Sequence, residues 1–415
     1  MNGIAPTGRT GRRRHSPLAR AGLLAALLLA GGCSGTSIVP DTFDIMPSRV
    51  NNGMGRAFHA AVWMPDQQNL MLVGGQDKDG IALSGSQFAE RIACSTCSFI
   101  PEGALDPGVG RVNPALATTA DGVLIAGGQA SGVEPANPGA PPAVLPVSSA
   151  VADALHYRPI SAFVDTVAQP AGAAGAALGT LNGTPYLSGG RDTTGNVSAA
   201  ILAFNGASFL HNWDMVRERE GHTVTPLADG SLLIVGGFGL GGFALRSAEL
   251  FDPVNGAAEL PGIDGPWEDR ALHTATASTD GCQVLIYGGV NSGGLVAGPE
   301  LFTSAGAGCA GDGRFHVVPL AGPEDRRVYH SATRLDNGDV LIVGGVLDDV
   351  GTVTGTARLF NFASQLLRDT AGPLSFPRFG HSASVMPDGS VLVAGGLDGV
   401  FVPVTEVERY VPTSF

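Results

Sequence analysis

Seven Gly-Gly pairs divide the chain into units of similar length. Each pair follows a short apolar run, and the first glycines of the pairs are Gly74, Gly127, Gly189, Gly236, Gly288, Gly344 and Gly395. Successive pairs are 53, 62, 47, 52, 56 and 51 residues apart. A fixed period of this size is typical of chains that arrange many copies of one supersecondary unit. The chain is therefore predicted to fold as seven copies of one unit.

One unit can be interpreted from "RFGHSASVMPDGSVLVAGG", residues 378–396. Alternation in "HSASVM" predicts an innermost strand, and Asp-Gly after it favours a hairpin turn because it tolerates positive φ angles. The continuous apolar run "SVLVA" predicts a strand that is buried on both faces. The glycine pair comes directly after this strand, and glycine is expected there because a side chain would collide with neighbouring backbone. Third strands are predicted in 247–253, 298–304, 356–362 and 405–412, with more variable fourth strands after them.

Copies 2 and 3 depart from this pattern. Pro114 stands where copy 2 would have the repeated histidine, and segment 171–179, also predicted as a strand, lacks both Arg and His. Copy 2 carries a proline-rich insertion at 130–146 between its second and third strands. We expect this insertion to form a long surface loop.

The last copy ends at Phe415 without a fourth strand, whereas residues 41–46 form a spare strand before the first copy. We expect residues 41–46 to close a ring as the outer strand of the final sheet, because closure removes an exposed sheet edge. The repeats resemble kelch motifs over residues 41–415. This resemblance implies an all-β fold, a seven-bladed β-propeller of four-stranded blades similar to the central propeller of galactose-oxidase-like proteins.

The first 32 residues have the pattern of an export signal, with five arginines followed by the apolar run "AGLLAALLLAGG". That run is too short to span a membrane. "LLAGGC" resembles a bacterial lipoprotein signal, which implies cleavage before Cys33 and an acyl group such as palmitate on that cysteine. Residues 33–40 would tether a propeller at 41–415 to the cell envelope, and Ser34 favours the outer membrane. An ordinary cleaved signal and twin-arginine export are the alternatives.

Charge limits the partners of the exported chain. Removal of residues 1–32 takes away five of the 24 basic residues and none of the 37 acidic residues, which leaves a formal net charge of −18. A chain of this charge repels nucleic acids and anionic lipids. No nucleic-acid partner is therefore expected, and membrane contact is expected through the lipid anchor only.

Four cysteines remain after Cys33, an even number that predicts two disulfides in an exported chain. Cys282 lies at the first turn of copy 5, and Cys309 lies in the third-to-fourth loop of the same copy. These two connections share one rim of a four-stranded meander, so a Cys282–Cys309 disulfide is predicted. Cys94 and Cys97 would form a second, local disulfide. The alternatives for this CxxC are a redox pair or half of a metal site.

Five copies carry Arg-x-x-His on the rim that also holds the second-to-third loops. The pairs are Arg56 and His59, Arg219 and His222, Arg270 and His273, Arg327 and His330, and Arg378 and His381. These groups could ring the central channel and attract an anionic ligand. Because a catalytic site is usually asymmetric and this motif repeats, we favour a structural role. In that role, each pair joins neighbouring blades through hydrogen bonds to backbone carbonyls.

Acidic clusters on the same rim are the candidates for a metal site. Residues 76–80 ("QDKDG"), 347–351 ("LDDVG") and 397–399 ("LDG") could hold calcium through oxygen ligands. Asp and Gly are also ordinary turn residues, and the sequence has no twelve-residue calcium loop. We therefore assign no metal ligand, no cofactor and no catalytic residue.

These features favour a monomeric binding scaffold that presents rim loops to a protein or carbohydrate ligand. The alternative is a metal-free sugar enzyme of the epimerase or mutarotase kind, an activity that the resemblance to exported kelch proteins implies. A copper oxidase is less favoured, because its ligand set cannot be assembled from Tyr157, Tyr186, Tyr287, Tyr329 and Tyr410. An enzyme should have a concave pocket at the channel mouth with convergent Arg and Glu, whereas a scaffold should have a broader face.

Overall fold

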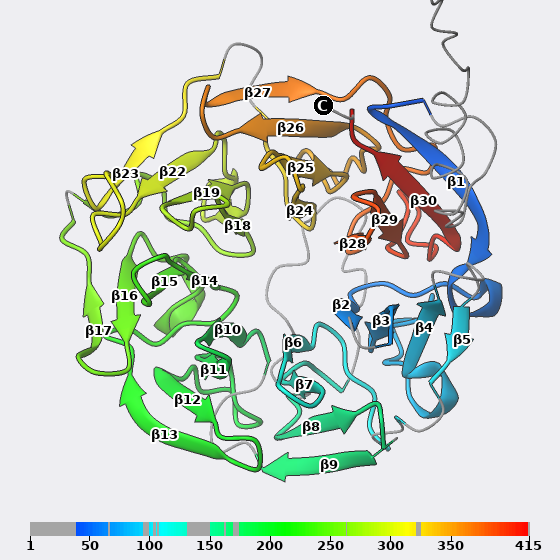
Figure 1. Ribbon diagram of the computed structural model, residues 1–415, viewed down its shortest axis with the longest axis horizontal. Coiled ribbons are helices and arrows are strands. Elements are labelled where there is room, and N and C mark those ends of the chain that lie inside the picture. The colour runs from blue at the N-terminus through cyan, green and yellow to red at the C-terminus, as the bar shows by residue number, and fades with distance from the viewer. Residues whose placement is uncertain are drawn as a thin grey trace, which may run out of the picture.

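The chain forms seven four-stranded antiparallel sheets around a central axis (Figure 1). The computed structural model describes residues 39–413 apart from 65–66, 94–98, 103–104, 106–107, 131–149, 162, 169–173, 263 and 321–324. The predicted signal segment, Cys33, the Cys94–Cys97 pair and residues 131–146 of the insertion lie outside the described residues. The predicted all-β, seven-bladed propeller is confirmed.

Each blade begins next to the axis and continues outward. Blades 1 to 3 contain β2 (Ala60–Met64), β3 (Asn69–Val73), β4 (Ala89–Ala93) and β5 (Phe99–Pro101); β6 (Ala115–Thr118), β7 (Val123–Ala126), β8 (Asp153–Arg158) and β9 (Phe163–Ala168); and β10 (Ala177–Leu181), β11 (Thr184–Ser188), β12 (Ala200–Phe204) and β13 (Phe209–Asp214). Blades 4 and 5 contain β14 (Thr223–Pro226), β15 (Leu232–Val235), β16 (Ala248–Asp252) and β17 (Gly256–Glu259); and β18 (Thr274–Ala277), β19 (Gln283–Tyr287), β22 (Glu300–Thr303) and β23 (Arg314–Val317). Blades 6 and 7 contain β24 (Ser331–Arg334), β25 (Val340–Val343), β26 (Ala357–Asn361) and β27 (Leu366–Asp369); and β28 (Ser382–Val385), β29 (Val391–Ala394), β30 (Glu406–Val411) and β1 (Thr42–Arg49).

The second strand of a blade is buried on both faces, as its continuous apolar sequence predicts. All residues of β3, β7, β15, β25 and β29 are buried. Val391 of β29 packs in the core shared with blade 6, whereas the next residue, Leu392, packs in the core shared with blade 1. Because neighbouring side chains on a strand point to opposite faces, each blade lies between two hydrophobic interfaces.

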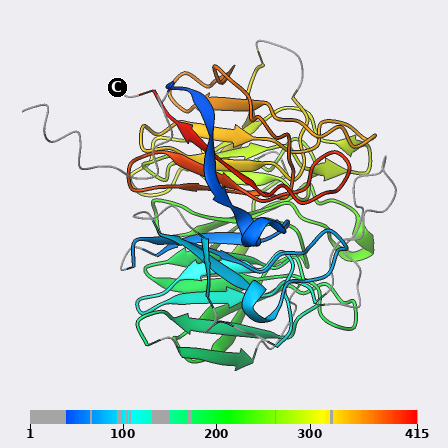
Figure 2. The same cartoon turned by 90° about the vertical axis from the view of Figure 1, so that its right-hand side faces the viewer.

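The N-terminal strand closes the ring. β1 pairs antiparallel with β30, with Phe43 opposite Tyr410, and Figure 2 shows the two strands side by side although they come from opposite ends of the chain. The Tyr410 hydroxyl donates to Asp41 Oδ1 at 2.6 Å. The predicted closing strand is confirmed, and it extends to Arg49. This pairing covers the edge that β30 would otherwise expose.

The propeller has two distinct rims. We call the rim that carries the second-to-third loops and the links between blades the connection rim, and the opposite one the turn rim. A two-stranded hairpin, β20 (Val290–Asn291) and β21 (Gly294–Leu295), forms the second-to-third loop of blade 5. The described helices are the 3-10 segments η1 (Val50–Gly53), η2 (Gly85–Gln87) and η4 (Leu240–Gly242), and none is long and apolar enough to cross a membrane. Within the described part of the strand predicted at 171–179, β10 begins at Ala177.

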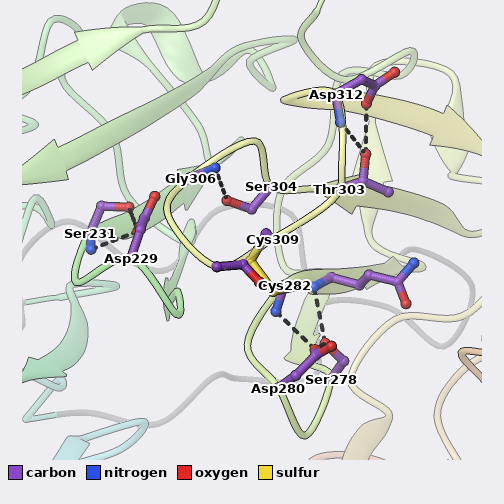
Figure 3. Close-up of a disulfide and its surroundings, with 12 residues drawn as sticks. Asp229, Ser231, Ser278, Asp280, Cys282, Thr303, Ser304, Gly306, Cys309 and Asp312 are labelled. Carbon is purple, nitrogen blue, oxygen red and sulfur yellow. Dashed lines mark hydrogen bonds between the residues drawn. A yellow bond between two sulfur atoms is a disulfide. The ribbon is translucent and has the colours of Figure 1, made fainter.

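A disulfide joins Cys282 and Cys309 on the turn rim of blade 5 (Figure 3). Their Cα atoms are 5.4 Å apart. The Cys282 amide donates to Asp280 Oδ1 at 3.0 Å in the turn between β18 and β19, and Cys309 lies between β22 and β23. The predicted pairing is confirmed, because antiparallel order brings the first and third connections of a blade to the same rim.

Candidate functional site

The five arginines of the repeated motif are buried inside their own blades, with exposed fractions of 0–2%. In blade 5, Arg270 Nη1 donates to the Gly288 carbonyl at 3.0 Å. The equivalent bonds in the other blades are Arg56–Gly74, Arg219–Gly236, Arg327–Gly344 and Arg378–Gly395. Each guanidinium group therefore ties the start of its blade to the first glycine of that blade's Gly-Gly pair, and its charge is directed into the blade.

A glutamate on the third strand neutralises the arginine in four blades. The ion pairs are Arg56–Glu90, Arg219–Glu249, Arg270–Glu300 and Arg378–Glu408. Burial lowers the pKa of Arg219, and the attraction of Glu249 partly offsets that effect. These glutamates are only 0–3% exposed, so both charges of each pair are held away from water.

The same glutamates bind the chain that arrives from the preceding blade. Glu300 accepts the amide hydrogen of Trp267 at 2.8 Å and that of Glu268 at 3.3 Å. Sequence reasoning missed these glutamates. A signal was present, because glutamate follows arginine by 30 residues in blades 4, 5 and 7. The arginines thus join blades only indirectly, through this carboxylate, because their bonds to the glycine carbonyls stay within one blade. The prediction that the arginines join neighbouring blades through backbone carbonyls is therefore wrong.

The five histidines of the motif bridge each blade to the one before it. Their Nε2 atoms lie 2.8–2.9 Å from hydroxyl oxygens, in the pairs His59–Ser382, His222–Ser188, His273–Thr223, His330–Thr274 and His381–Ser331. In four cases, the hydroxyl belongs to the first residue of the preceding innermost strand. Blade 3 has Ala177 at that position, and Ser188 of β11 supplies the hydroxyl instead.

Burial keeps these imidazoles neutral. It lowers the pKa of His330 to about 3, with a further contribution from the charge of Arg327. Burial and the charge of Arg378 likewise lower the pKa of His381 to about 3. The Nδ1 atoms of all five histidines have no hydrogen-bond partner among the described residues. The tautomer with hydrogen on Nε2 is therefore favoured, because it leaves a bare lone pair on Nδ1 and not an unpaired N–H.

In five of the blades, the first glycine of the pair makes room for the Arg-x-x-His motif of the next blade. Gly288 has φ +66°, and a Cβ atom there would lie 2.2 Å from the Arg327 carbonyl oxygen and 2.7 Å from His330 Cε1. The Gly289 amide donates to the same Arg327 carbonyl at 2.8 Å. The Gly-Gly pair and Arg-x-x-His are therefore two halves of one interface between blades.

Blade 6 reverses the charge of the third-strand position. Arg358 stands where four blades have glutamate, and Asp325 supplies the carboxylate from the connecting segment. Asp325 lies 2.8 Å from Arg327 Nε and 3.2 Å from Arg358 Nη1, and it accepts the Tyr287 hydroxyl. In blade 2, Arg111 pairs with Asp153 at 2.6 Å. The carboxylate that pairs with the repeated arginine can therefore come from a different position in the blades that depart from the repeat.

A cavity of about 300 Å³ occupies the centre of the ring. It is lined by the five motif histidines and by Phe58, Leu272 and Tyr329, and on the side of blades 2 and 3 by Asn113, Gly175 and Ala176. No arginine or glutamate of the described residues lines this cavity. The described lining thus consists of imidazole, aromatic, leucine and small or uncharged side chains.

Bulky residues line the channel where the blades begin at the connection rim. Phe58, Leu272 and Tyr329 have φ of +53°, +56° and +55°, in the left-handed region that glycine adopts at the equivalent positions of blades 4 and 7. The Phe58 and Tyr329 rings meet edge to face with centroids 5.4 Å apart. Bonds between blades hold this strained backbone, since Phe58 N donates to the Gly380 carbonyl at 2.8 Å and Leu272 N to the Gly221 carbonyl at 2.9 Å.

The acidic clusters considered for calcium act as loop caps. Asp77 Oδ1 accepts the amide hydrogens of Asp79 and Ile81, and Asp348 and Asp398 accept two amide hydrogens each in the same way. Within the described ranges, no three His, Cys, Asp or Glu side chains form a group that could hold a metal ion. Two of the tyrosines that were considered for a copper site bind carboxylates: the Tyr287 hydroxyl donates to Asp325, and the Tyr410 hydroxyl donates to Asp41.

More than half of the exposed large apolar side chains lie on the connection rim. Of 17 large hydrophobic residues that are exposed in the described chain, ten lie in its loops and links. We call these ten the apolar rim set: Met54, Ile81, Val109, Val216, Leu240, Phe243, Trp267, Val350, Val400 and Val402. Leu240 and Phe243 of blade 4 are 67% and 70% exposed. Sequence reasoning placed the binding loops on this rim but did not single out these residues.

The fold and these contacts define a seven-bladed β-propeller whose blades are joined by buried Arg–carboxylate and His–hydroxyl contacts. A search against models of known protein families found no match, and a comparison with curated protein sequences found none either.

Proposed function

We propose that this protein is an exported kelch-type scaffold, anchored at the cell envelope through a lipid on Cys33, whose connection rim binds a protein partner. The observation that carries the proposal is the apolar rim set. Exposed apolar residues that gather on one face of a soluble domain mark interaction surfaces, and aromatic residues such as Phe243 and Trp267 are enriched where proteins meet.

The ring provides a rigid support for such a surface. Loops mounted on a rigid framework commonly carry binding residues. The buried Arg–Glu pairs and the double-sided cores fix the blades beneath the loops. The disulfide of blade 5 favours export, because disulfides persist in oxidising compartments. The lining of the central cavity, without convergent Arg and Glu among the described residues, favours the scaffold over a sugar enzyme.

Site-specific photo-cross-linking tests the docking face. A photoreactive residue at Phe243 or Leu240 is expected to capture a protein partner on intact cells, because both side chains project from the connection rim. Ile160 and Val254, which are 81% and 87% exposed in turn-rim loops, are the matched control positions. Equal capture from both rims, or no capture from Phe243 and Leu240, would contradict the proposal.

The proposed lipid anchor on Cys33 leads to a separate prediction. Cys33→Ser is expected to abolish incorporation of labelled palmitate and to move the protein from the membrane fraction to the soluble fraction, because a thioether-linked lipid needs the Cys33 sulfur. Cys282→Ser serves as the control, since it also removes one sulfur. Unchanged palmitate labelling of Cys33→Ser would exclude a lipid at this position.

A further inference from the structure

The seven blades contribute unequally to the mouth of the central cavity. One residue of each blade, immediately before the position of the motif histidine, lines this mouth: Phe58, Asn113, Gly175, Gly221, Leu272, Tyr329 and Gly380. A Cβ atom at Gly380 would lie 2.9 Å from the Phe58 ring, and one at Gly221 would lie 3.1 Å from the Leu272 side chain. The large side chains of blades 1 and 5 therefore also cover the glycines of blades 7 and 4.

Blades 2 and 3, which lack the motif histidine, form the less covered side of the mouth. Asn113 stands in blade 2 and Gly175 in blade 3. The three atoms nearest to a Cβ atom at Gly175 would belong to Gly221 and Glu220, and none would be closer than 3.2 Å. The two degenerate blades therefore present an amide and a glycine where three other blades present large side chains.

The described lining of the cavity is rich in rings and uncharged. It contains five imidazoles that burial keeps neutral, together with the rings of Phe58 and Tyr329. No Arg, Lys, Asp or Glu among the described residues lines it. A charged group would lose its hydration there without gaining an opposite charge, whereas aromatic rings pack favourably against other rings. The lining therefore favours a neutral aromatic group.

Asn113 supplies a hydrogen-bonding group at the less covered side. Its backbone N–H donates to the Phe58 carbonyl at 2.7 Å, which fixes the position of the residue. Its side chain is half-buried and has no hydrogen-bond partner among the described residues. A side-chain amide both donates and accepts hydrogen bonds, as a phenol hydroxyl does, whereas an indole N–H only donates. A phenol therefore matches this amide better than an indole does.

We propose that the central cavity receives a tyrosine side chain of the protein that docks on the connection rim. The phenol ring lies among the imidazoles and the rings of Phe58 and Tyr329, and its hydroxyl binds the Asn113 amide. This inference rests on the proposed docking function and names the residue that anchors the partner. Tyrosine is a frequent anchor in pockets near the centre of interfaces, and this cavity of about 300 Å³ lies at the centre of the ring (Figure 1).

Ligand-observed NMR titration of the full chain with N-acetyl-tyrosinamide tests the cavity without the partner. The probe is expected to bind with saturation. Gly175→Leu is expected to weaken binding about tenfold by overfilling the mouth, and blade 5 already has leucine at this position with φ +56°. Gly183→Leu is the matched control, because it makes the same change at φ +79° in the turn between β10 and β11, with no atom within 4 Å of the added Cβ. It should bind the probe as the wild type does.

The hydroxyl contact has its own readout. The wild type is expected to bind N-acetyl-tyrosinamide about fivefold more tightly than N-acetyl-phenylalaninamide, because the second probe cannot hydrogen-bond to Asn113. Asn113→Gly suits the φ of +51° at this position and should abolish that preference. This variant carries the test if Gly175→Leu does not fold. An unchanged preference in Asn113→Gly would overturn the role of the amide.

The cavity and the docking function fail in different ways. Absence of saturable N-acetyl-tyrosinamide binding, or equal binding by the wild type and Gly175→Leu, would overturn the cavity inference and leave the docking function intact. Probe binding without capture of a partner from Phe243 or Leu240 would contradict the docking function, and it would overturn a partner protein as the source of the phenol.

Discussion

Replacing Glu300 by alanine is expected to destabilise the propeller by about 3–5 kcal/mol, the usual cost of leaving one member of a buried ion pair without its partner. Arg270 would keep a buried charge, and the amides of Trp267 and Glu268 would lose their acceptor. The expected result is a large fall in the urea midpoint, measured by intrinsic fluorescence.

Glu268→Ala is the matched control, because it removes the same charge from an exposed neighbour. An exposed substitution of this kind usually changes stability by about 0.5 kcal/mol or less. If Glu300→Ala and Glu268→Ala have the same urea midpoint, the Arg–Glu pairs do not hold the blades together.

Acidification is expected to destabilise the propeller well before its carboxylates titrate. An unfolded histidine has a pKa of about 6.5, whereas burial lowers the pKa of His330 and His381 to about 3 and the pKa of His59, His222 and His273 far below the usual value. Between these limits, the unfolded chain binds protons that the folded chain does not bind. The free energy of unfolding therefore falls as pH falls through about 6.5.

The expected loss from about pH 7 to about pH 5.5 is roughly 1 kcal/mol for each motif histidine, on the order of 5 kcal/mol in total. Urea midpoints across this interval measure it, because unfolded carboxyl groups titrate lower, near pH 4. His330→Gln should reduce the pH dependence by about 1 kcal/mol, the share of one motif histidine. A flat profile above about pH 5.5 would show that the histidines are not held neutral by the fold.

The architecture could be predicted from local sequence patterns. The spacing of the Gly-Gly pairs predicted seven blades, the unbroken apolar runs predicted double-sided strands, and the spare strand at 41–46 predicted how the ring closes. Cys282 and Cys309 were paired correctly because the order of antiparallel strands alone decides which turns share a rim. Each of these inferences depends on periodicity within one repeat or on chain order.

The roles of the repeated polar residues could be assigned only from the tertiary structure. Arg-x-x-His looked like a single unit, but the arginine binds within its blade while the histidine binds a hydroxyl of the preceding blade. The glutamates were missed because they lie some 30 residues after the arginines and contact them only through strand pairing. Likewise, the position of Arg358 in place of a glutamate became evident only from the register of β26. Periodicity reports which residues recur, whereas contacts between strands and blades depend on long-range packing that local sequence does not encode.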